Sequence, residues 1–218
     1  SFWDKVLNFS GKGDAEDISK REDIACPDRD KWAFIDIEVG LNDKKIHDIG
    51  AIRYDGAKYR NASKQELLIF LSGVDFVCGH NIIHHDAKYL WKDEHISAIL
   101  VDTLYMSPIL FAERPYHRLV KDDKLVTEHL NNPVNDCMKA QGLLREEIAK
   151  WNSLEDDKQR IFTSLLYPHD EFRGFLQMVG AQDEANDLSG LIRDVYGTKI
   201  CVNADIENLI SNYPCELA

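Results

Sequence analysis

Two acidic side chains stand inside an otherwise apolar stretch near the start of the chain. Asp36 and Glu38 interrupt the run KWAFIDIEVG at residues 31–40. Successive side chains of a strand point to opposite faces, so the two acids share one face of the expected strand. Trp32 and Phe34 alternate onto that face, and a solvated edge strand would leave both rings in water. The alternative is a site for a hard divalent cation such as Mg²⁺, which prefers carboxylate oxygens.

Two further aspartates occupy positions where helices are expected to begin. The segment GHNIIHHDAKYL at residues 79–90 follows an expected buried strand, and Asn81 is a suitable N-cap for a helix that carries Asp86. Pro133 suits the first position of another helix, which puts Asp136 in its first turn ahead of apolar residues at core spacing. A buried acid needs a partner or a metal. The four acids are therefore candidates for one site.

Histidines around Asp86 raise a second possibility for the metal. His80, His84 and His85 lie within six residues of one another and invite a zinc interpretation. No cysteine stands beside them, and the spacing is not that of a structural zinc site. Their interpretation as ordinary loop and helix residues is favoured.

The elements that must position these residues alternate between strands and helices. A polar turn at 41–45 predicts that a second strand at 46–53 returns antiparallel to the first. Gly50, in the middle of that second strand, would let another backbone or a ligand come close to the sheet. A short third strand is expected after residue 57, and Asp102 is typical of a helix N-cap. The pattern indicates an α/β fold.

Composition limits the classes of protein that the chain can belong to. Its 218 residues can form one good-sized domain and an appendage. The net charge of −12 argues against broad electrostatic binding to nucleic acid, although bound divalent cations would change the local field. Five scattered cysteines without zinc spacing are typical of reduced thiols in a cytosolic protein. Without a signal peptide or a transmembrane stretch in the sequence, a cytoplasmic protein with no membrane partner is expected.

Five short motifs, taken in order, carry a resemblance to a known family: Asp36–Glu38, Ile49–Ile52, Gly79–Asn81 with Asp86, Asp102–Leu104, and Asp136. Their order and spacing resemble the DnaQ-like (DEDD) superfamily of 3′→5′ exonucleases. The resemblance implies a ribonuclease-H-like mixed sheet, with antiparallel hairpin strands beside parallel strands, flanked by helices. It places the exonuclease domain at 31–150. The segment before it, 1–30, is expected to be a partly flexible tether, because much of it is rich in Gly, Asp, Glu and Lys. Residues 151–218 would form a helical appendage or a linker towards a following domain.

The resemblance also implies the chemistry of the site. Two divalent cations, Mg²⁺ or Mn²⁺, would be bound by Asp36, Glu38, Asp86 and Asp136, and the terminal phosphodiester would be hydrolysed. The backbone of Ile37, Val39 and Gly40 would lie near the terminal nucleotide, and Asn81 would supply a polar contact to the substrate.

The chain departs from the family pattern at two places. The family usually has Thr after its Glu, and this chain has Val39. The family also has His five residues, or Tyr four residues, before its last Asp, where this chain has Asn131 and Asn132. Asparagine can orient a water but cannot accept its proton at neutral pH, so general-base catalysis worth about 10²–10⁴-fold would be lost.

Other residues are candidates for the missing base. His129 is near Asp136 in the sequence, and His84 and His85 are near Asp86. In a second alignment, His117 and Asp122 form the last motif, since they have the His-x4-Asp spacing. That alignment leaves only about one helix between Asp102 and the final Asp of the motif, and it lacks the small-residue helix that Asp136 begins.

A second resemblance concerns the context of the domain. The run at 114–140 and the tail at 213–218 are similar to the exonuclease-like front end of certain long bacterial RecQ-type DNA helicases, which implies a helicase motor later in the same chain. Two functions stay open. One is an exonuclease, attenuated or not, that acts on DNA 3′ ends and serves a helicase in repair or in defence against foreign DNA, with an oligoribonuclease-like activity on short RNA as a variant of this enzyme class. The other is a degenerate nuclease fold that docks a DNA end or a protein with little or no catalysis.

Overall fold

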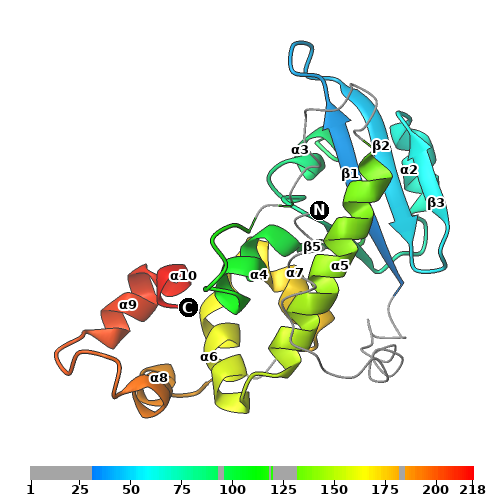
Figure 1. Cartoon of the computed structure of the whole chain (residues 1–218). Helices are drawn as coiled ribbons and strands as arrows, with labels where there is room; N and C mark the ends of the chain where they lie inside the picture. Colours follow the sequence, from blue (N-terminus) through cyan, green and yellow to red (C-terminus); the bar gives the residue numbers. More distant parts are fainter. Residues whose placement is uncertain (1–30, 93–95, 118, 120–131, 182–184) are drawn as a thin grey trace, which may run out of the picture.

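Five strands form one mixed sheet at the centre of the molecule. The computed structural model describes residues 31–92, 96–117, 119, 132–181 and 185–218, so the predicted tether at 1–30 lies outside the described residues. The strand order is β3-β2-β1-β4-β5 (Figure 1). β1 pairs antiparallel with β2 and parallel with β4, β5 is parallel to β4, and β3 is antiparallel to β2. The strands are β1 (Trp32–Val39), β2 (Ile46–Arg53), β3 (Lys58–Asn61), β4 (Phe76–Gly79) and β5 (Ile99–Asp102).

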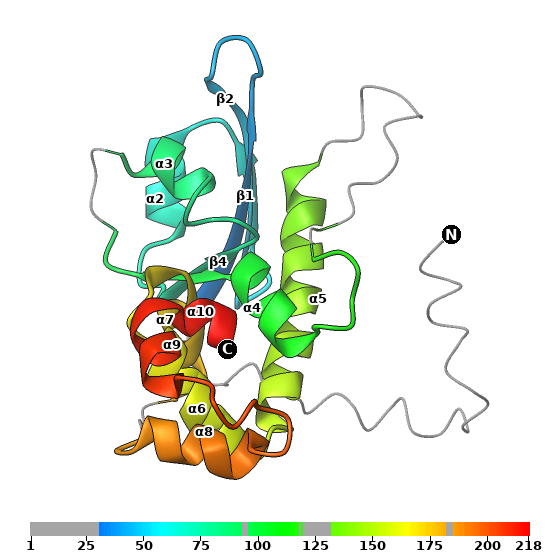
Figure 2. The ribbon, with the colours of Figure 1, turned by 90° about the vertical axis from the view of Figure 1, so that its left-hand side faces the viewer.

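Helices cover both faces of the sheet, so the predicted α/β fold with an antiparallel hairpin beside parallel strands is confirmed. Figure 2 shows α5 along one face and α2 and α3 on the other. No helix within the described ranges is both long enough and apolar enough to cross a membrane. The helices are α2 (Lys64–Phe70), α3 (Asp86–Leu90), α4 (Thr103–Leu110), α5 (Pro133–Asn152), α6 (Asp156–Leu166), α7 (Asp170–Met178), α8 (Leu188–Tyr196), α9 (Ile206–Asn212) and α10 (Pro214–Leu217).

Alternate residues of β1 belong to two different hydrophobic cores. Phe34 is fully buried in the core that contains Leu144 of α5. Ile35 and Ile37 are buried in the core that contains Leu67 of α2. This alternation confirms the predicted faces of the strand, and it puts the two acids of β1 on the side that α5 covers.

The C-terminal helices extend the hydrophobic core that contains Phe34 and Leu144. α5 runs past residue 150, and Trp151 near its end meets Phe175 of α7 edge-on, with 5.9 Å between the ring centroids. Gly174 lets α7 lie directly against β5, because a Cβ at this position would overlap the carbonyl oxygen of Leu100. The predicted division at residue 150 therefore falls inside α5, and the core of the sheet extends into α6, α7 and α8.

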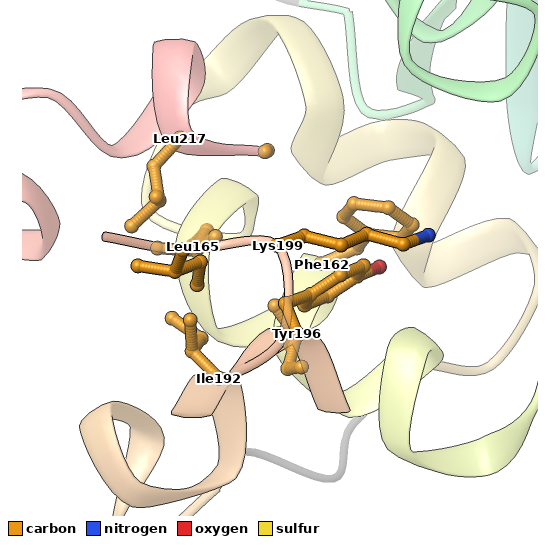
Figure 3. A pocket seen from close by; sticks show the side chains of 9 residues that line it. Phe162, Leu165, Ile192, Tyr196, Lys199 and Leu217 are labelled. Carbon is orange, nitrogen blue, oxygen red and sulfur yellow. The ribbon is translucent and has the colours of Figure 1, made fainter. Parts of the chain in front are cut away.

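An apolar pocket of about 240 Å³ lies among the C-terminal helices, away from the acids of β1. Figure 3 shows Phe162, Leu165 and Ile192 around it, with the side chain of Lys199 lying alongside Tyr196. The pocket is lined by Ile161, Phe162, Leu165, Ile192, Tyr196, Lys199, Ile200, Leu217 and Ala218.

Candidate metal centre

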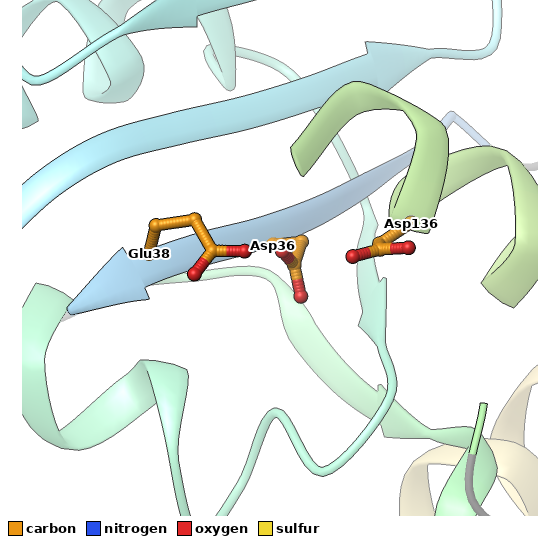
Figure 4. A group of neighbouring side chains, drawn as sticks. All are labelled: Asp36, Glu38 and Asp136. Atoms are coloured by element: carbon orange, nitrogen blue, oxygen red, sulfur yellow. The ribbon is translucent and has the colours of Figure 1, made fainter. Parts of the chain in front are cut away.

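Three carboxylates from two distant parts of the chain meet beside β1. Asp36 and Glu38 come from the strand, and Asp136 comes from the first turn of α5. One carboxylate oxygen of each lies within 4.8 Å of the others. Figure 4 shows Asp136 reaching from its helix towards Asp36. Because all the donors are hard oxygen atoms, the set fits Mg²⁺ or Mn²⁺ better than a softer ion.

The helix that carries Asp136 is placed by its own first residues. Asn132 is its N-cap, and the side-chain oxygen of Asn132 accepts a hydrogen bond from the backbone N–H of Val134, at 3.1 Å. Pro133 occupies the first helical turn, as the sequence predicts. The amide of Asn132 therefore serves the helix end, and its oxygen is engaged with the backbone.

Close approach of α5 to the sheet depends on Gly50 of β2. A Cβ at Gly50 would overlap backbone atoms of Pro133 and Val134, which confirms the prediction that another backbone comes close there. The thiol of Cys137 donates to the carbonyl oxygen of Gly50 at 3.3 Å. Burial raises the pKa of Cys137 well above its usual range, and the neighbouring carboxylates of Asp36, Asp86 and Asp136 raise it further. Cys137 is thus a neutral donor that fastens the helix to β2.

The fourth predicted acid joins β1 through the backbone. Asp86, at the start of α3, accepts a hydrogen bond on Oδ1 from the N–H of Ile37, between the two acids of the strand, at 3.0 Å. Asp86 is 2% exposed, and this burial raises its pKa, while contact with His85 and the N–H of Ile37 lower it. The structure therefore brings Asp86 to the strand, although it is not one of the three acids within 4.8 Å of one another.

The loop before Asp86 is held by Asp102, a residue whose larger role the sequence analysis missed. Asp102 is fully buried at the end of β5. As predicted, it caps α4, because its side chain accepts from the N–H of Leu104. It also accepts from the N–H groups of Asn81, at 2.8 Å, and Ile83, at 3.1 Å. The only signal for this second role was the position of Asp102 at the end of β5, which lies parallel to β4.

The prediction that Asn81 is the N-cap of the helix that carries Asp86 is wrong. The N-cap of α3 is His85, and Asn81 lies five residues before the helix with a φ of 65°. Its backbone N–H donates to Asp102, and its carbonyl oxygen accepts from the N–H of His85. Asparagine tolerates this left-handed conformation better than most residues, so Asn81 forms the turn instead of the helix cap.

The histidines of this region point to different partners. His84 Nε2 lies 2.9 Å from Glu171 of α7, and His85 Nδ1 lies 3.4 Å from Asp86 Oδ2. His80 accepts the N–H of Leu119 on Nε2, so its Nδ1 carries the proton and donates to Thr103 at 2.9 Å. These separate contacts do not form the joint ligand set that the zinc interpretation requires.

The candidates for the missing base are divided between described residues, which include His84 and His85, and residues that the structure does not describe. Asn131, His129 and Asp122 all lie outside the described residues. His117 is described, and its Nδ1 lies 2.9 Å from Ser107 Oγ of α4. The alignment that replaces Asp136 by Asp122 stays untested, but Asp136 itself meets Asp36 and Glu38.

The residues predicted to meet the substrate lie at the end of β1. Ile37 is buried, and its N–H is already engaged by Asp86. Val39 and Gly40 are partly exposed where the strand enters the turn to β2. Gly40 is closely surrounded, since a Cβ there would overlap the side chains of Asp43 and His47. Their roles towards a nucleotide stay predictions.

Comparisons with models of known protein families, with curated proteins and with solved structures found no match to this chain. The fold and site so far define a helix-flanked α/β protein with a cluster of three carboxylates, two from its central strand and one from α5.

Proposed function

We propose that the chain is a metal-dependent 3′→5′ exonuclease of the DnaQ-like type, with a ribonuclease-H-like fold. The observation that carries the proposal is the meeting of Asp36, Glu38 and Asp136, whose oxygens lie within 4.8 Å of one another although they come from β1 and α5. A mixed sheet with an antiparallel hairpin beside parallel strands supports the same assignment. DNA 3′ ends are the proposed substrate, and a helicase of the RecQ type is the proposed context.

The chain's own residues have distinct parts in this proposal. Asp36, Glu38 and Asp136 would hold one or two Mg²⁺ or Mn²⁺ ions, and Asp86 would complete the set beside Ile37. Bound divalent ions supply an activated water and neutralise charge that develops on the phosphoryl oxygens. Asp102 keeps the loop before Asp86 in place through two backbone hydrogen bonds.

A docking module is the second candidate function, and one observation favours it. Asn132 stands where some members of the DnaQ-like family have a Tyr that acts on the water, and its side-chain oxygen caps α5. A chain with the metal ligands but no general base would bind a DNA end or a partner protein and cleave it slowly.

Digestion of DNA labelled at its 3′ end distinguishes the two candidates. A single strand and a duplex are incubated with Mg²⁺ or Mn²⁺ and with the wild type, Asp36→Ala, or Asp157→Ala as a control. Asp157 pairs with Arg160 on α6, away from the site. We expect shortened products from the wild type and the control and none from Asp36→Ala. Equal cleavage by wild type and Asp36→Ala, or no cleavage with either metal on either substrate, would refute the exonuclease.

A further inference from the structure

A lysine side chain contacts the carboxylate cluster from within the same helix. Lys139 follows Asp136 by three residues on α5, and its Nζ lies 3.2 Å from Oδ1 of Asp136. The side chain of Asp136 is 14% exposed, and that of Lys139 is 31% exposed. The ammonium group therefore contacts a carboxylate that the proposed function assigns to metal binding.

This ion pair differs from the other pairs of the same spacing in the described helices. Lys158–Glu155, Arg160–Asp157 and Arg173–Asp170 also join residues three apart, but their acidic side chains are 77%, 56% and 76% exposed. Exposed ion pairs of this kind contribute little to the stability of the folded chain, because water screens both charges. Asp136 is largely shielded from water and has an oxygen within 4.8 Å of an oxygen of each of two further carboxylates, so Lys139 places a positive charge directly on one member of the cluster.

We propose that the ammonium group of Lys139 competes with the divalent cation for the carboxylate of Asp136. This competition lowers the affinity of the site for the cation. This inference rests on the metal site of the proposed function. In the metal-free chain, the ammonium balances part of the negative charge that Asp36, Glu38 and Asp136 share. A divalent ion that binds Asp136 has to displace the ammonium or bind beside it against the repulsion between the two positive charges.

The proposal predicts the direction of a change in affinity. Removal of the ammonium takes a positive charge away from Asp136, so repulsion among the three carboxylates increases and a divalent cation that binds them relieves more of it. Removal of the charge at residue 139 should therefore tighten binding of Mn²⁺ by about tenfold, which corresponds to the loss of one partly buried ion pair. If Lys139 instead oriented Asp136 for the metal, the same change would weaken binding.

The experiment is a titration of Mn²⁺ into the metal-free chain. Binding is measured by calorimetry and by the decrease in the electron paramagnetic resonance signal of unbound Mn²⁺. The variants are Lys139→Met, Lys139→Gln and Lys139→Arg. Lys158→Met is the matched control, since Lys158 forms an exposed pair of the same spacing with Glu155. Circular dichroism checks that each variant is folded. Two neutral variants, Met and Gln, are made so that the test still stands if one of them does not fold.

We expect tighter binding by Lys139→Met and Lys139→Gln, and wild-type affinity for Lys139→Arg and Lys158→Met. Unchanged or weaker binding by both neutral variants would overturn the inference. A chain that binds Mn²⁺ with the predicted order of affinities but never cleaves DNA would overturn only the exonuclease reaction. No binding by the wild type or any variant would overturn both the inference and the metal site.

Discussion

Gly50 lies directly opposite Asp36 in the antiparallel ladder of β1 and β2. Because Gly50 has no Cβ, the backbone of Pro133 and Val134 can lie against β2, and the first turn of α5 then brings Asp136 to the acids of β1. The carboxylate cluster thus depends on a glycine that has no side chain to contribute to it.

Substitution of Gly50 by Val should separate α5 from the sheet. Its side chain would overlap the start of the helix, and overpacking of this kind destabilises proteins by about 1–3 kcal/mol. We expect a lower free energy of unfolding in urea together with weaker Mn²⁺ binding. Gly142→Ala is the control, because a Cβ at that exposed helical position meets nothing within 4 Å. It should stabilise the chain by about 0.5–1 kcal/mol and leave Mn²⁺ binding unchanged. Normal Mn²⁺ affinity in Gly50→Val would contradict this account of the site.

Divalent cations should stabilise the folded chain. Mg²⁺ at one hundred times its dissociation constant should raise the free energy of unfolding by about 2.7 kcal/mol. Asp36→Asn should abolish this increase, because the cluster loses a charged ligand. The increase is measured by urea unfolding with and without Mg²⁺, and chelation should reverse it. A Mg²⁺ effect of the same size in Asp36→Asn would mean that the ion binds elsewhere.

Replacement of Asp102 by Asn should loosen the loop that leads to Asp86. One amide oxygen cannot accept the three backbone N–H groups that the carboxylate accepts, and we expect a loss of about 2 kcal/mol. Amide hydrogen exchange should become faster at Asn81 and Ile83. The control is Asp205→Asn, since Asp205 caps α9 through the N–H of Asn208 and asparagine is an equally good cap. Unchanged exchange at Asn81 and Ile83 would refute the role of Asp102.

Glu147 should make the stability of the chain depend on pH. It is fully buried in α5, and neither carboxylate oxygen has a hydrogen-bond partner among the residues that the structure describes. Burial raises the pKa of Glu147 well above its usual range, and the nearby charge of Asp102 raises it further. Between the ordinary and the raised pKa, the unfolded chain releases a proton that the folded chain retains, so the free energy of unfolding falls as pH rises.

Glu147→Met removes this carboxyl group and should stabilise the chain at pH 8 by about 1–3 kcal/mol relative to the wild type. The difference should shrink when the pH approaches 4.5, because the wild-type carboxyl is then protonated in both states for much of the time. Urea unfolding of both proteins across this range measures it. A difference that does not vary with pH would show that packing, and not ionisation, distinguishes the two side chains.

Local sequence signals were enough to predict the elements that carry the candidate site. The alternation of residues 31–40 predicted both faces of β1, and Phe34 and Ile35 indeed belong to different cores. Pro133 correctly predicted the start of α5. These signals succeed because strand alternation and helix caps depend on residues only a few positions apart. Asn81 was wrongly predicted as an N-cap, since its turn is held by Asp102, 21 residues away.

The residue pattern was sufficient to name the carboxylates that could form a site and the face of β1 on which two of them lie. The packing of the folded chain was needed to learn that Asp136 meets Asp36 and Glu38, that Asp86 reaches β1 through the N–H of Ile37, and that Lys139 contacts Asp136. The two kinds of information differ in the distance along the chain over which the residues interact. Alternation along a strand is a property of neighbouring residues, whereas the distance between β1 and α5 is set by packing between segments about a hundred residues apart, at a contact that Gly50 makes possible.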